Sequence, residues 1–373
     1  MSAALLLVLA LSQAAPAADD DECVVLTNVC ILTVGKGDIE TGTIVIHGGK
    51  IVAVGADVPV PAGARVLDRK GMTAFPGLVH ALSRLGMPEG PPDATGASQL
   101  ALDDLNPLSD ALGPAARCGV TTFAIQPSGV GIAGRGAILK SSGGARGPQV
   151  VEKSAFLRIV LQTGTAPKDA LRQALEGARK AFDADRKKVD EKTLPLLLFL
   201  KGELPAIVEA GTPAELLHFW QVLDAFSDCS PRVVIAAPLD AYKVAGALGS
   251  RKSRVILRPY LALAPFTRER INNAAELERA GAQVAFAPIS DSPEGLQGIF
   301  FRMGELVKYG LSRETALRGL TLSPAEMLGI DKRVGSIEAG KDADLILFSG
   351  DPLSPQARIR EVYIDGRPVL PGE

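Results

Sequence analysis

Apolar and polar residues alternate along both ends of the chain. Within residues 23–70 and 342–370, short runs place apolar side chains at about every second position, and Gly, Asn or Pro separates many of these runs. This period of two is typical of strands with one buried face. The N-terminal runs are CVVLTNVCILT, TGTIVIHGG, KIVAVGADV and ARVLDRKG, and the C-terminal runs are DADLILFSG and IREVYIDGRPVL.

Between these ends the pattern changes to short runs that are almost wholly apolar. Such runs are typical of strands buried on both faces. Segments with a helical stripe separate several of them, and in residues 167–182 the stripe consists of Leu171, Leu175, Ala178 and Phe182. The predicted strands are GVTTFAI, LPLLLFL, RVVIAAP, RVILRPY and AQVAFAP, and the other predicted helices span residues 212–226, 267–281 and 295–310.

Strands that alternate with helices predict an α/β fold with a parallel sheet, here a distorted TIM (β/α) barrel over residues 75–332. The two β-rich ends, residues 19–74 and 333–373, are expected to pair into a small composite β-sandwich. This arrangement places the first barrel strand in PGLVHALSRLG, residues 76–86.

The composition excludes some classes of function. The chain has 373 residues, of which 47% are hydrophobic and 22% charged, and its formal net charge is -2. With no basic field, nucleic acid is not an expected partner. Aromatic residues make up 5% of the chain, which disfavours a base-stacking surface.

The first residues predict export. The apolar run over residues 3–11 precedes Ala15-Pro16-Ala17, which matches a signal-peptidase site, so we expect a signal peptide over residues 1–18 and a periplasmic or extracellular location. A membrane anchor or a disordered tail is the alternative. The mature chain has no predicted membrane span. No two of its four cysteines have CxxC spacing, and we expect four buried free thiols at Cys23, Cys30, Cys118 and Cys229.

Taken in order, several segments resemble the amidohydrolase superfamily, closest to its imidazolonepropionase-like and dihydroorotase-like branch. Residues 42–81 are similar to the opening sandwich and first barrel strand of that family, and SGVGIAGRGAILK resembles a hairpin of the branch. The most specific stretch is residues 309–353, which resembles the closing helices and the return to the sandwich. The resemblance covers the mature chain and implies the same distorted barrel and composite sandwich.

The resemblance also implies a hydrolase of C–N and related bonds, in which zinc or another divalent metal activates water at the barrel mouth. The usual ligands are a His-x-His after the first strand, two more histidines and a late Asp. In this chain the His-x-His positions correspond to Leu82 and Arg84, a later His position corresponds to Ala237, and only the Asp survives, as Asp291. We therefore expect a degenerate member without a metal cofactor.

The histidine count supports that expectation. The chain has three histidines, His47, His80 and His218, so a site with four histidines is impossible. His47 falls in the predicted sandwich and His218 in a predicted helix. His80 is the one histidine near the mouth.

Other residues offer weaker hypotheses. Arg84 could replace the lost cation and pair with Asp291, or it could point to solvent. Arg84, Lys201 and Arg258 are candidates for binding a small ligand, which could be anionic. His80, Asp291 and Asp240 are weak candidates for metal-free acid–base catalysis.

Three functional hypotheses follow. The favoured one is an exported pseudoenzyme with a binding or structural role. The second is an enzyme that hydrolyses a carbon–nitrogen bond through an altered site. The third is an inactive partner subunit of an active paralogue, and a homo-oligomer is a further arrangement that the sequence leaves open.

Overall fold

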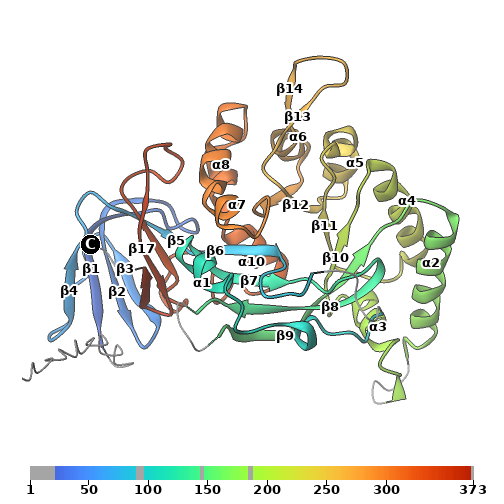
Figure 1. Cartoon of the computed structure of the whole chain (residues 1–373), viewed down its shortest axis with the longest axis horizontal. Helices are drawn as coiled ribbons and strands as arrows, with labels where there is room; N and C mark the ends of the chain where they lie inside the picture. Colours follow the sequence, from blue (N-terminus) through green and yellow to red (C-terminus); the bar gives the residue numbers. More distant parts are fainter. Residues whose placement is uncertain (1–21, 90–95, 143–146, 184–187, 371–373) are drawn as a thin grey trace, which may run out of the picture.

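The computed structural model describes residues 22–89, 96–142, 147–183 and 188–370 and builds them around two eight-stranded sheets (Figure 1). One sheet forms the barrel, and the other combines strands from both ends of the chain. The predicted signal peptide, residues 1–18, lies outside the described residues. In the part of the chain that the structure describes, no helix has the length and hydropathy needed to cross a membrane.

The barrel sheet follows chain order. Neighbouring strands are parallel except around β8 (Gly131–Lys140), which pairs antiparallel with both β7 (Val120–Ile125) and β9 (Gln149–Val160). Residues 319 and 320 lie between the first and the last barrel strand and bind both. Leu320 O accepts from Val79 N of the first strand (3.1 Å), and Gly319 O accepts from Phe286 N of the last strand (2.8 Å). The result is a nearly closed barrel. Its strands are β6 (Leu78–Ser83), β7 (Val120–Ile125), β8 (Gly131–Lys140), β9 (Gln149–Val160), β10 (Ala206–Glu209), β11 (Val233–Ala236), β12 (Arg254–Leu257) and β15 (Gln283–Phe286).

Inward-facing residues of these strands form one buried cluster. Because side chains alternate along a strand, one set faces inward while the other packs against the outer helices. Helix α10 (Leu322–Leu328) adds Ala325, Met327 and Leu328 to the inner set. The strand residues in that cluster include Val79, Ala81, Ala124, Ile138, Ile207, Val234, Ile256 and Ala285.

Helices cover the outside of the barrel sheet (Figure 1). In α2 (Thr165–Lys180), Leu171, Leu175 and Ala178 are buried, which confirms these three residues of the predicted helical stripe. The fourth residue, Phe182, lies beyond the end of the helix and is half-buried. Helix α4 (Pro213–Leu223) begins at a capping box in which Thr212 and Glu215 satisfy each other's backbone N–H groups. The other long outer helices are α4 (Pro213–Leu223), α6 (Asn273–Ala280) and α8 (Ile299–Lys308).

The second sheet joins the two ends of the chain, as the alternating runs predicted. Strand β5 (Thr73–Pro76) pairs antiparallel with β16 (Leu345–Phe348), and this pairing connects the N-terminal strands to the C-terminal ones. The domain boundaries expected from the sequence stay a prediction. The remaining strands of this sheet are β1 (Val24–Ile31), β2 (Ile39–His47), β3 (Lys50–Gly55), β4 (Arg65–Asp68), β17 (Ile359–Ile364) and β18 (Arg367–Leu370).

Two predicted elements are wrong in type or extent. The run LPLLLFL is not a strand but helix α3 (Leu194–Leu200), with Pro195 in its first turn, where the missing N–H costs nothing. The segment over residues 267–281 is helical only from Asn273, because Arg270–Asn272 forms strand β14 in a hairpin with β13 (Leu261–Leu263). A short apolar run cannot distinguish a buried strand from a buried helix.

The cysteines are free, as predicted, but only one of them is buried. Cys118 lies in the core, whereas Cys23, Cys30 and Cys229 are half-buried. The expectation of four buried thiols is therefore wrong for three of them.

Candidate functional site

The carboxyl ends of the barrel strands surround a cavity of about 330 Å³, here called the mouth cavity. Seven of the eight barrel strands, or the loops that follow them, supply at least one lining residue, and the loop after β15 carries Asp291. This is the end of a βα barrel where ligand sites are usually built. The lining residues are Leu82, Arg84, Gln126, Arg158, Glu209, Ala210, Ala236, Ala237, Ile256, Arg258, Ile289, Ser290 and Asp291.

Asp291 is tied to the first barrel strand by two hydrogen bonds. His80 Nε2 lies 2.7 Å from Asp291 Oδ1, and the backbone N–H of Arg84 donates to Asp291 Oδ2 at 2.6 Å. His80 is buried, with a side chain 2% exposed, and its Nδ1 faces the backbone N–H of Leu82 at 3.4 Å. Both ring nitrogens therefore have partners inside the protein, and His80 does not line the mouth cavity.

These contacts control the ionisation of Asp291. Burial alone would raise the pKa of this carboxyl, but the hydrogen bond and charge of His80, the N–H of Arg84 and the charge of Arg258 together hold the pKa below its usual range. Asp291 is consequently a carboxylate at neutral pH. Its side chain is 27% exposed, and that exposed part faces the mouth cavity.

Arg84 does not form the ion pair that the sequence suggested. Its guanidinium Nη2 donates to the carbonyl of Pro88 at 2.8 Å, and only its backbone N–H reaches Asp291. His80 takes the position beside the carboxylate instead. The hypothesis that the Arg84 side chain replaces the lost cation is therefore wrong, although Arg84 does line the mouth cavity.

Arg258 lies at the mouth, as the sequence predicted. It follows the end of β12, and its Nη1 donates to the carbonyls of Pro288 (3.1 Å) and Ile289 (2.6 Å) in the loop that leads to Asp291. These bonds fix the guanidinium against that loop. The Arg258 side chain and the Arg84 backbone thus both bind the segment over residues 288–291.

Two other predicted residues lie elsewhere. Lys201 caps the end of α3, where its ammonium sits 4.8 Å from the centre of the Phe182 ring. Because α3 leads into β10, this position belongs to the opposite end of the strand from the mouth. Asp240 follows β11 but pairs with Lys243 at 2.9 Å and does not line the mouth cavity.

Sequence reasoning missed Arg158, Glu209 and Gln126. Arg158 Nη2 and Glu209 Oε2 form an ion pair of 2.6 Å across β9 and β10, and Gln126 Nε2 donates to the carbonyl of Ala81 at 3.0 Å. Once the AIVE run, residues 206–209, is recognised as a strand, its terminal Glu becomes a mouth residue. The mistaken strand at LPLLLFL hid that signal.

The divalent metal implied by the family resemblance does not fit this donor set. The corresponding positions Leu82 and Ala237 offer no ligand atom, and Arg84 brings a positive charge. Among the described residues, no group of three or more His, Cys, Asp and Glu side chains is arranged to hold a metal ion. The cavity carries arginines where a metal site needs neutral or anionic donors.

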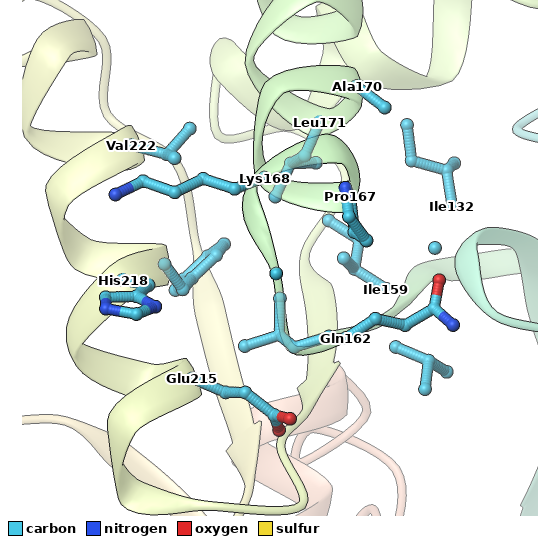
Figure 2. A pocket seen from close by; sticks show the side chains of 15 residues that line it. Ile132, Ile159, Gln162, Pro167, Lys168, Ala170, Leu171, Glu215, His218 and Val222 are labelled. Atoms are coloured by element: carbon cyan, nitrogen blue, oxygen red, sulfur yellow. The ribbon is translucent and has the colours of Figure 1, made fainter.

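A second pocket, of about 160 Å³, lies outside the barrel between α2 and α4 (Figure 2). Two of its charged side chains already have partners within the protein. Glu215 accepts from Thr163 Oγ1 (2.8 Å) and from the backbone N–H of Gly211 (2.7 Å), and Lys168 donates to Gln221 (2.8 Å). This pocket is a largely apolar crevice between two helices and is the weaker candidate for a site.

The comparisons with known proteins agree on similarity to amidohydrolases. The amidohydrolase family model matches residues 267–369. Amidohydrolase tasK of Hapsidospora irregularis is 38% identical over 79 residues, which is 21% of this chain and 8% of that protein. The imidazolonepropionase of Sphingopyxis alaskensis is 34% identical over 99 residues, which is 25% of this chain and 24% of the enzyme. These matches therefore span less than a quarter of either relative.

Solved structures match over nearly the whole chain. The crystal structure of an amidohydrolase from Thermotoga maritima superposes with a TM-score of 0.78 at 25% identity, covering 93% of this chain and 99% of that one. A putative prolidase from Bifidobacterium longum gives a TM-score of 0.55 at 18% identity, covering 94% of this chain and 96% of that one. The second match shows the fold alone.

Proposed function

We propose that this chain, which belongs to the amidohydrolase superfamily, binds a small molecule in the mouth cavity and does not carry out metal-dependent hydrolysis. One observation carries the proposal. The three positions that correspond to family metal ligands, Leu82, Arg84 and Ala237, all line the same cavity as Asp291. The side chains that face a ligand there are thus an apolar residue, a cation and a methyl group.

Electrostatics supports the same reading. A divalent cation in this cavity would lie among the guanidinium groups of Arg84, Arg158 and Arg258, which repel it. The Glu209 carboxylate is engaged by Arg158, and the Asp291 carboxylate is engaged by His80. Both carboxylates that line the cavity thus already have a hydrogen-bond or ion-pair partner in the protein, and neither is free to attract a metal ion.

Hydrolysis without a metal is the competing function, and it would use His80 with Asp291. The geometry favours it less, because His80 is buried and neither of its ring nitrogens faces the cavity. Asp291 does face the cavity, but its lowered pKa makes it a weak base. The pair serves better to hold Asp291 in place than to move a proton.

Metal content tests the proposal. The purified chain is incubated with zinc and with manganese, desalted, and its metal counted per chain by elemental mass spectrometry. The matched control is the triple variant Leu82→His, Arg84→His, Ala237→His, which restores imidazoles at the family positions beside Asp291. We expect near-zero metal in the wild-type chain and a gain in the variant. Stoichiometric, tightly held metal in the wild-type chain would overturn the proposal.

A further inference from the structure

The charges of the mouth cavity also define what it binds. We infer that its ligand is a small carboxylic acid of the amino-acid type, whose carboxylate contacts Arg84 and Arg258 and whose nitrogen donates a hydrogen bond to Asp291. This inference rests on the proposed function, since it assumes that the cavity holds an organic ligand and not a metal.

The two guanidinium groups supply the anion-binding half. Among the described residues, the hydrogen bonds of the Arg84 and Arg258 side chains go only to backbone carbonyls, and neither side chain forms an ion pair. A guanidinium has five N–H donors, so most donors of both groups remain available. Arginine forks match the planar geometry of a carboxylate.

The backbone bonds also hold these side chains before a ligand arrives. Arg258 Nη1 is fixed by two carbonyls, those of Pro288 and Ile289, and Arg84 Nη2 is fixed by the carbonyl of Pro88. A side chain that is already ordered loses less entropy when it binds. The arrangement is therefore suited to recognition and does not depend on a pair of flexible surface arginines.

Asp291 supplies the other half. Each of its oxygens accepts one hydrogen bond from the protein, whereas an ionised carboxylate has about four acceptor sites. The carboxylate faces the cavity and stays ionised at neutral pH. It can thus accept an N–H from a ligand that Arg84 and Arg258 hold by the carboxylate.

The charge balance selects this class over phosphate. Three arginines and two carboxylates line the cavity, and Arg158 and Glu209 compensate each other at 2.6 Å. The remaining charged side chains of the cavity are two arginines, Arg84 and Arg258, and one carboxylate, Asp291, so the net charge of the cavity is +1. A doubly charged phosphate would meet the Asp291 carboxylate without offering a donor to it, whereas an amino acid or an N-acyl amino acid satisfies all three groups.

The experiment screens ligands against the full-length purified chain. Thermal-shift measurements with the twenty common amino acids and their N-acetyl derivatives find the best probe, and calorimetry measures its Kd. The same titration then uses the corresponding acid without nitrogen and inorganic phosphate. We expect the nitrogen-bearing acid to bind about tenfold or more tightly than its nitrogen-free analogue, because it adds a hydrogen bond to a charged group.

Variants assign the binding to named residues. Arg258→Gln should weaken binding of the best probe about tenfold or more, while Arg254→Gln at the other end of the same strand should leave the Kd unchanged. Asp291→Asn should remove the preference for the nitrogen-bearing acid. Circular dichroism and Tm verify that each variant is folded, and Arg84→Gln offers a second test if one of them is not.

The outcomes separate this inference from the proposed function. If the chain binds none of the acids, or binds phosphate more tightly, the inference is wrong while the metal result for the proposed function stands. Equal affinities of the wild-type chain for the acids with and without nitrogen would also overturn it. If the wild-type chain holds stoichiometric metal, the proposed function fails, and this inference, which assumes a cavity without metal, fails with it.

Discussion

Asp291 shows how one retained residue can keep its place after its partners have changed. Its carboxylate is held by the His80 ring and by the backbone of Arg84, and these contacts connect the last barrel strand to the first. The residue therefore has a structural reason to persist that requires no metal. The same contacts make His80 a positioning residue and not one that faces a ligand.

At this scale we predict that His80→Ala destabilises the fold by about 1–3 kcal/mol, because the largely buried Asp291 carboxylate loses a hydrogen-bond donor. Urea unfolding at pH 7 measures the change. Since the pKa of Asp291 is lowered in the fold, its contribution is present above its unfolded pKa and is lost as the pH falls through the folded value. The loss should therefore shrink in acid, and a loss that stays constant to pH 3 contradicts the assignment.

At the scale of elements, the sequence predicted the positions of most barrel strands, but it could not distinguish strand from helix in every apolar run. GVTTFAI, RVVIAAP, RVILRPY and AQVAFAP each contain a barrel strand, and in the structure Arg258 and Asp291 follow the last two of them. LPLLLFL failed because its leucines suit a buried helix as well as a strand. That one error moved Lys201 to the wrong end of the barrel and concealed Glu209.

The capping box of α4 belongs to the same scale, since it begins the helix that follows β10. Glu215 accepts hydrogen bonds from Thr163 Oγ1 and from the backbone N–H groups of Gly211 and Thr212. Glu215→Ala should destabilise the chain by about 1–3 kcal/mol, as three donors lose their acceptor. Glu176→Ala, on the exposed face of α2, is the matched control and should stay within about 0.5 kcal/mol. Thermal and urea unfolding compare the two, and equal losses would reject the role of the cap.

At the scale of the whole molecule, one buried lysine connects the barrel to the terminal sheet. Lys140 ends β8 of the barrel, and its Nζ contacts Asp342 Oδ2 (2.6 Å), Asp344 Oδ1 (3.2 Å) and Asp365. The three aspartates lie beside or between the C-terminal strands β16, β17 and β18. The sequence did not predict this cluster, because a lysine and three aspartates spaced over more than two hundred residues give no local signal.

This cluster gives the fold an unusual dependence on pH. Burial raises the pKa of Asp344 to about 6, against the opposing charge of Lys140 and with the added repulsion of Asp365 and Asp342. Its Oδ1 accepts from the backbone N–H of Asp365 (3.0 Å), but its Oδ2 has no partner among the described residues. Between about pH 4 and 6 the folded chain thus binds a proton that the unfolded chain does not, so ionising Asp344 costs stability as the pH rises.

Asp344→Asn keeps the acceptor for Lys140 and Asp365 but cannot ionise. Relative to this variant, the wild-type chain should lose about 2 kcal/mol of unfolding free energy between pH 4.5 and pH 7.5, as the raised pKa requires. Urea unfolding of both proteins across that pH range measures the difference between their unfolding free energies. The contributions of the other carboxylates cancel in this difference, because both proteins share them. Parallel stability curves would mean that Asp344 is ionised throughout and that Lys140 alone compensates its burial. A difference that grows from pH 4.5 to about pH 6 and then levels off would show that the barrel and the terminal sheet are joined by a contact that favours mildly acidic surroundings.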